Sequence, residues 1–198
     1  MALNFANNNS LSSITALPAS ISGGGLNLIS TQTASSSSTI SFTSGIDSTY
    51  KEYIFKFINI HPSEAEHFTF QASTNSGSSY GVTITSTYFH ATHDEGDTST
   101  ALSYVAGKDL AQSTSYLRLA DSLSTSADES SSGTLHLFSP SDTTFVKHFI
   151  SRSSVSATGA KDGFVSGYFN TTSAIDAIQF KMSSGNIDSG VIKLYGIS

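Results

Sequence analysis

The chain has 198 residues, of which 37% are hydrophobic and only 12% are charged, with a formal net charge of −6 and no Cys. The missing Cys excludes disulfides, thiolate metal sites and a Cys nucleophile, and the scarcity of Lys and Arg argues against a nucleic-acid partner. Phe, Tyr, Ile, Val, Ser and Thr suit a pleated, half-buried surface, whereas residues that favour helices are few. We therefore expect an all-β protein.

The first 25 residues are polar, with scattered apolar side chains, and they end in the Gly-rich run "SGGG". This composition predicts an extended N-terminal arm and flexible link over residues 1–25, followed by one β-sandwich domain over residues 26–198. We expect the arm to contact neighbouring subunits, although its apolar residues could also fold back on their own sandwich. The candidate assembly residues in the arm are Leu3, Phe5, Leu11, Ile14 and Leu17.

From Leu26 onward, short runs of alternating apolar and polar residues are separated by turn signals every 8 to 12 residues. Such spacing predicts an antiparallel two-sheet β-sandwich that resembles a jelly roll. The predicted strands are residues 26–31, 39–44, 50–60, 67–73, 82–91, 115–120, 133–139, 145–151, 165–169, 178–183 and 190–197.

The run at residues 50–60 is apolar on both faces, which predicts a central strand. Strict alternation places Tyr53, Phe55 and Phe57 on one face, and it places Ile54, Ile58 and Ile60 together on the other. Elsewhere alternation predicts which side chains point into the core. They are Phe68, Phe70, Ala72, Val82, Ile84, Tyr88, Leu135, Leu137, Ile178, Phe180 and Met182.

One candidate catalytic motif is "GSSYG" at residues 77–81, which matches the G-x-S-x-G pattern of serine hydrolases. That motif needs a strand before the serine and a helix after it, so that the serine sits on a strained elbow. Here a second strand pattern follows. We therefore interpret Ser79 as part of a hairpin turn and predict no catalytic residue there.

The candidate metal site is "FHATHDEGD", which holds His90, His93, Asp94, Glu95 and Asp97 within nine residues. Residues three apart on a strand point to opposite faces, so the two histidines converge only if the chain bends between them. Neither the helical zincin spacing nor the EF-hand spacing is present. We predict a strand that ends near residue 91 and a polar loop after it, with a metal site as the alternative.

The surrounding segment, residues 90–130, carries seven acids and two bases. We interpret this excess as a solvated acidic face, and the neighbouring pair Asp128 and Glu129 as an acidic loop. No phosphate-binding loop is present, and we expect no cofactor. No apolar run approaches the ~20 residues that a membrane-spanning helix needs, so we expect no membrane insertion.

Two segments in the second half, "GTLHLFSPSDTTFVKHFISRSS" and "GYFNTTSAIDAIQFKMSSGNIDSGVIKLYGIS", carry a family resemblance. They resemble a β-sandwich module of virion proteins from tailed bacteriophages, common in phages of marine bacteria. The final "SSGNIDSGVIKLYGI" is its most specific part and looks like the last hairpin of that module. With the matching early strands, the resemblance covers roughly residues 45–198.

This resemblance implies a jelly-roll-like structural module of capsid decorations, tail fibres or other appendages, and it supplies no catalytic residue. We therefore expect a non-enzymatic protein on the exterior of a virion, a homo-oligomer (a trimer first of all) that contacts capsid or tail proteins. The alternative is a receptor- or carbohydrate-binding head that recognises a host surface glycan. The tyrosines available for stacking on a sugar are Tyr80, Tyr88, Tyr104, Tyr116 and Tyr168.

Overall fold

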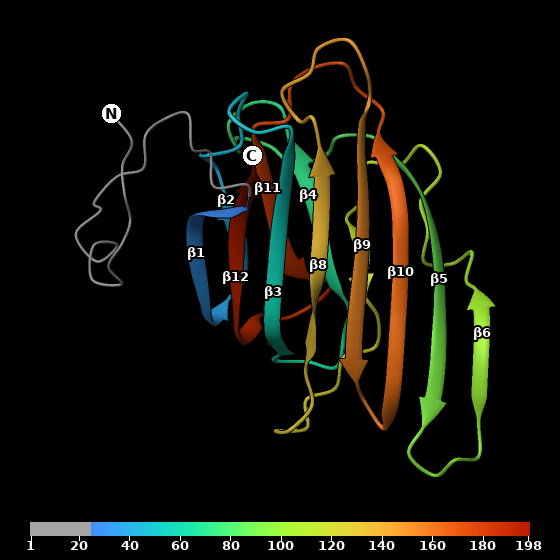
Figure 1. The fold of residues 1–198 in the computed structure, drawn as a ribbon. Helices are drawn as coiled ribbons and strands as arrows, with labels where there is room; N and C mark the ends of the chain where they lie inside the picture. The colour runs from blue at the N-terminus through green and yellow to red at the C-terminus, as the bar shows by residue number, and fades with distance from the viewer. Residues whose placement is uncertain (1–24) are drawn as a thin grey trace, which may run out of the picture.

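The structure, a computed structural model, describes residues 25–198, which form twelve strands and no helix. All pairings are antiparallel, and the strands make two sheets that face one another (Figure 1). The expected antiparallel two-sheet β-sandwich is thus confirmed. The predicted arm residues Leu3, Phe5, Leu11, Ile14 and Leu17 lie outside the described residues.

The two sheets differ in width. In spatial order, the larger sheet contains β1 (Leu26–Ser37), β12 (Ile187–Ile197), β3 (Glu52–Pro62), β8 (Ser131–Phe138), β9 (Lys147–Ser156), β10 (Gly159–Phe169), β5 (Ile84–Asp94) and β6 (Thr100–Tyr104). The smaller sheet contains β2 (Ile40–Phe42), β11 (Ala177–Met182), β4 (Phe68–Ser73) and β7 (Leu117–Ala120). The outer edge strand β6 therefore extends beyond the smaller sheet, as Figure 1 shows.

The core lies between the sheets and is rich in phenylalanine. Phe180 of the smaller sheet stacks on Phe68 at 5.6 Å between ring centroids, and it meets Phe55 of the larger sheet edge-on at 5.3 Å. Offset and edge-to-face arrangements are the ones that aromatic rings prefer. Among the side chains predicted to point inward, all but Val82 are buried, and Val82 is partly buried against the core.

Strand β3 is central, as predicted, but its alternation is interrupted by a bulge. Its register against β8 shifts between Phe57 and Ile60, and Asn59 has a positive φ of 50°. A bulge inserts one residue and reverses the facing of those that follow. Ile60 is consequently fully buried, whereas Ile58 is 40% exposed. The prediction that Ile58 and Ile60 share a face was wrong.

Two predicted hairpins are also wrong in their pairing. The turn after β4 leads to β5, and the turn after β11 leads to β12, but in both cases the two strands belong to different sheets. Gly and Ser signal that the chain reverses, and this signal does not say which strands then pair. These connections cross from the smaller sheet to the larger one.

Candidate functional site

The histidines of "FHATHDEGD" lie on opposite faces of one strand. Strand β5 runs to Asp94, three residues further than predicted, so His93 and Asp94 belong to the strand and not to the loop. His90 faces inward beside Tyr88, with ring centroids 6.0 Å apart. His93 projects outward, where its Nε2 lies 3.0 Å from Oδ1 of Asp97.

The carboxylate of Asp94 organises the turn between β5 and β6. It accepts hydrogen bonds from the backbone N–H groups of Thr98 (2.9 Å) and Ser99 (2.8 Å) and from the Thr98 hydroxyl. The hydroxyl first, and then these backbone donors, lower the pKa of Asp94. Within residues 25–198 no group of three or more His, Asp or Glu side chains is placed to hold a metal ion.

Ser79 lies in the turn that joins β4 to β5. Its hydroxyl accepts a hydrogen bond from Nδ2 of Asn75 at 2.9 Å, and its backbone N–H donates to the side-chain Oδ1 of Asn75 at 3.0 Å. Strand β5 follows the turn. The strand-to-helix elbow that a serine hydrolase needs is therefore missing around this serine.

The acidic segment contains a buried ionic centre that sequence reasoning missed. Asp121 is only 2% exposed. Its Oδ2 accepts from Lys108 and, at 3.4 Å, from Lys161, while its Oδ1 accepts from Arg118 at 3.2 Å. The interpretation of residues 90–130 as a solvated acidic face was thus wrong for Asp121. The i, i+3 spacing of Arg118 and Asp121 was a signal, but Lys161 comes from a distant strand.

The ionisation of Asp121 reflects two opposing effects. Burial on its own raises the pKa of this carboxyl. Hydrogen bonds from Lys108 and Ser122, together with the positive charges of Lys108 and Lys161, outweigh that effect and lower the pKa to about 2. Asp121 is therefore ionised at neutral pH and joins β7, β10 and the loop after β6.

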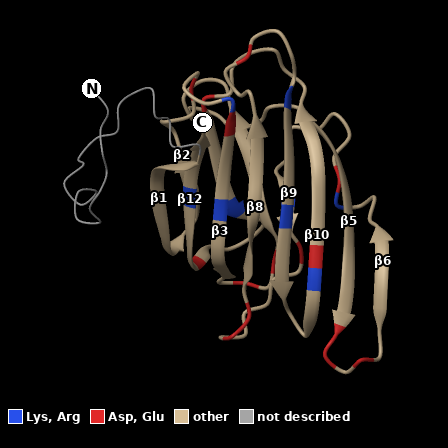
Figure 2. Cartoon of the chain, viewed as in Figure 1, with Lys and Arg blue, Asp and Glu red and all other residues tan. Residues whose placement is uncertain are grey.

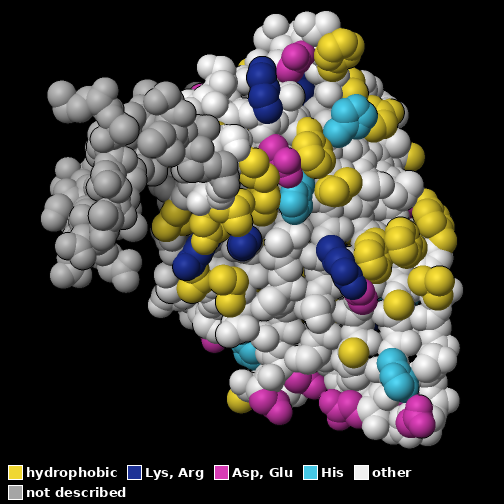
Figure 3. Space-filling model, viewed as in Figure 1, with side chains coloured by type: hydrophobic (Ala, Val, Ile, Leu, Met, Phe, Trp, Pro, Cys, Tyr) yellow, Lys and Arg dark blue, Asp and Glu magenta, His cyan; other side chains and the backbone are white. Residues whose placement is uncertain are grey.

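The outer face of the larger sheet carries a row of cations followed by aromatic rings. Strand register places Lys193 opposite Lys56, Lys56 opposite Thr134, and Thr134 opposite Arg152. Beyond Arg152 the row continues through aromatic side chains to the edge of the sheet. They are Phe164, Phe89 and Tyr104. Figure 2 shows the positive bands on β12, β3 and β9, and Figure 3 shows the apolar side chains gathered over β10, β5 and β6.

Arg152 is held rigidly at the centre of this row. Its Nε donates to both carboxylate oxygens of Asp162 (3.0 and 3.2 Å), and its Nη2 donates to Oδ2 of Asp162 at 2.6 Å. The guanidinium also lies 4.9 Å from the ring centroid of Phe164, which stacks on Phe89 at 4.7 Å. A planar guanidinium suits both contacts at once.

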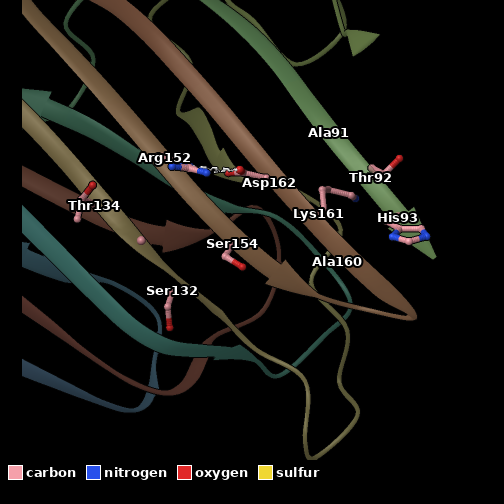
Figure 4. A pocket seen from close by; sticks show the side chains of 11 residues that line it. Ala91, Thr92, His93, Ser132, Thr134, Arg152, Ser154, Ala160, Lys161 and Asp162 are labelled. Atoms are coloured by element: carbon pink, nitrogen blue, oxygen red, sulfur yellow. Dashed lines mark hydrogen bonds and ion pairs between the residues drawn. The ribbon is translucent and has the colours of Figure 1, made fainter. Parts of the chain in front are cut away.

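Two open hollows flank Arg152. One, of about 510 Å³, is floored by small side chains, and Figure 4 shows the Arg152–Asp162 pair beside it. The other, of about 350 Å³, lies toward Ile150 and His136. Sequence reasoning missed this surface. Alternation could have shown that Arg152 and Asp162 point outward, but the row depends on the register of seven strands.

Strand β6, one of the two edge strands of the larger sheet, is the other unusual surface. Strand β6, which was not predicted, pairs with β5 on one side and is the last strand of the sheet. Its side chains Leu102 and Tyr104 are 76% and 59% exposed. Of the five tyrosines proposed for stacking, Tyr88 is buried, Tyr80, Tyr116 and Tyr168 are partly buried, and Tyr104 alone is largely exposed.

Comparison with known proteins assigns the chain to no family. No protein-family model matches the chain. No curated protein sequence matches it either. A search of the described residues for a helix with the length and apolar character to cross a membrane found none. The outer face and the β6 edge are therefore the features on which a function can be argued.

Proposed function

We propose that this chain is a non-enzymatic structural subunit on the exterior of a bacteriophage virion, a homo-oligomeric capsid decoration (cement) or appendage protein. The resemblance of residues 45–198 to the phage β-sandwich module supports the virion assignment. The exposed β6 edge supports assembly. Its mechanism is burial of apolar surface and pairing of strand edges between subunits.

The observation that carries the assembly proposal is the composition of β6. Natural sheets protect an edge with charge, proline, a bulge or a covering segment, because unpaired N–H and C=O groups invite pairing with another chain. The β6 sequence "TALSY" has no charge and no proline, and its pairing with β5 shows no register shift. Leu102 and Tyr104 add exposed apolar surface to this open edge. Such an edge suits a permanent contact with a neighbouring subunit.

The test is the mass of the purified protein in solution. Light scattering should give a small multiple of the 20.8 kDa chain, with a trimer as the first expectation. The Leu102→Lys variant should be a folded monomer, because a charge on the edge opposes pairing. Phe145→Lys is the matched control. The exposed fraction of Phe145, 71%, is similar to the 76% of Leu102, but Phe145 lies outside β6. A monomeric wild type, or an oligomer that survives Leu102→Lys, contradicts the proposal.

The N-terminal arm is proposed as the anchor to the particle. Deleting residues 1–25 leaves every described strand intact, because β1 begins at Leu26. The truncated chain should therefore keep its thermal transition but should not co-purify with particles. Incorporation equal to that of the full chain would show that the anchor lies in the sandwich.

A receptor- or carbohydrate-binding head is the second candidate. The observation in its favour is the outer-face row, in which Arg152 borders two open hollows and the cations Lys56 and Lys193 lie farther along the same row. Binding of fluorescently labelled protein to host cells distinguishes this role from a purely architectural one. A head should stain the cells at saturable sites, whereas a cement subunit should stain particles alone.

A further inference from the structure

Two lysines on the outer face lie directly opposite one another on paired strands, where their positive charges repel. Lys193 on β12 and Lys56 on β3 are direct cross-strand partners. Like charges directly opposite one another destabilise a sheet. Within residues 25–198 neither lysine has a carboxylate within salt-bridge distance, and the one recorded partner of their ammonium groups is the Tyr195 ring, 5.3 Å from Lys56. An anion placed between them would remove the repulsion.

The charge pattern continues along the same row. Arg152 lies two strands beyond Lys56, about 10 Å away at the backbone given the usual strand spacing. The acids on this face are already engaged, because Asp162 holds Arg152 and Glu52 lies 2.6 Å from Nδ1 of His136. The row therefore has positive charge to spare in a chain whose net charge is −6.

The floor between these cations is made of small hydroxyl side chains. Thr134 lies between Lys56 and Arg152 in the row, and Ser154 lines the adjoining hollow. Neither hydroxyl makes a hydrogen bond within the described residues, so both are available as donors and acceptors. Arg152 borders that hollow, whereas Lys56 and Lys193 lie beyond Thr134 in the row. Free hydroxyls next to a row of cations match a ligand that is rich in hydroxyl groups and carries carboxylates.

We propose that this cationic row, defined as Lys193, Lys56, Thr134 and Arg152, binds an acidic saccharide whose carboxylates lie against the lysines and Arg152 while its hydroxyls contact the floor. A single-stranded nucleic acid fits less well, because it needs aromatic faces for its bases. The faces of Phe164 are covered by Arg152 and Phe89, and the exposed Tyr104 lies three strands beyond Arg152, on β6. The proposal rests on the second candidate function, a carbohydrate-binding head, and names its ligand class; it does not depend on the β6 contact.

The experiment titrates isotopically labelled full-length protein with a galacturonic-acid oligosaccharide and follows backbone NMR shifts. A galactose oligosaccharide of the same length tests the need for carboxylates, and a single-stranded oligonucleotide tests for generic polyanion binding. The acidic sugar should bind saturably, with shifts centred on β12, β3, β8 and β9. The neutral sugar should bind at least about tenfold more weakly.

Three variants locate the site. Lys56→Ser with Lys193→Ser should weaken binding by at least about tenfold, and so should Arg152→Gln. Lys181→Ser is the matched control, because Lys181 lies on β11 in the other sheet, over the Tyr116 ring. All three should keep the wild-type thermal transition and the wild-type oligomer mass, which separates this site from the β6 contact.

Four results would overturn the proposal. They are no saturable binding of the acidic sugar at millimolar concentration, equal binding of the neutral sugar, unchanged affinity in the double lysine variant, and equally tight binding of the oligonucleotide through the same lysines. An oligomer that fails to form would count against the proposed assembly role alone.

Discussion

At the scale of single residues, Asp121 shows how one buried carboxylate organises several segments. Its oxygens engage Lys108, Arg118 and Lys161, which come from a loop, β7 and β10. A buried charge is costly unless it is paired, and removing one partner leaves the others uncompensated. The ionic centre therefore stabilises the native state only when the loop, β7 and β10 pack together correctly.

We predict that Asp121→Asn lowers the free energy of unfolding by about 3 kcal/mol at pH 7. Urea unfolding measures the change. Asp188→Asn is the control, because Asp188 accepts a hydrogen bond from the exposed Ser36 hydroxyl and has no cation within salt-bridge distance in the described residues. The control should change stability by less than about 0.5 kcal/mol. Equal effects of the two substitutions would contradict the account of this centre.

The same variant has a defined pH dependence. Because folding lowers the pKa of Asp121 from 3.8 to about 2, its stabilising effect is fully present above about pH 4 and is lost as the pH falls through 2. The difference between wild type and Asp121→Asn should therefore shrink as the pH falls from 4 to 2. A difference that stays constant down to pH 2 would show that the carboxylate is not held ionised by its neighbours.

At the scale of elements, alternation of apolar and polar residues predicted where the strands lie but not which strands pair with one another. Phe68, Phe70 and Phe180 were placed inward correctly, because a period of two is a local property of the chain. The bulge at Asn59 and the exchange of sheets after β4 depend on distant partners, so no local pattern could reveal them. The cationic row has the same origin, since Lys56, Thr134 and Arg152 meet only through register.

The close packing of β8 against its neighbours gives a prediction at this scale. A Cβ on Gly133 would lie 2.3 Å from the Arg152 carbonyl oxygen and 2.6 Å from the Phe57 ring. Gly133→Ala should therefore lower the free energy of unfolding by about 2 kcal/mol, because such overlap forces the strands apart. Thermal unfolding measures the loss.

Gly107→Ala is the matched substitution, because nothing lies within 4 Å of its added Cβ. It should leave the free energy of unfolding within about 0.5 kcal/mol of the wild-type value. If both alanine variants melt together, the tight contact between β8 and Phe57 is not a feature of the protein in solution.

At the scale of the whole molecule, the unequal sheets explain where interaction surfaces arise. The smaller sheet covers only part of the larger one, and β6 projects past it (Figure 1). No strand among residues 25–198 covers the outer face of the larger sheet, which carries cations toward β12 and apolar side chains toward β6 (Figures 2 and 3). One molecule thus separates a surface suited to subunit contact from a surface suited to an acidic ligand.

The most direct test of the proposed virion role is imaging of whole particles of a phage whose genome encodes this chain. The account predicts density for a sandwich of eight and four strands on the particle exterior, with copies in contact through β6 around a symmetry axis. Purified particles that lack the chain, or copies that meet neither each other nor the rest of the virion through β6 or residues 1–25, would contradict it.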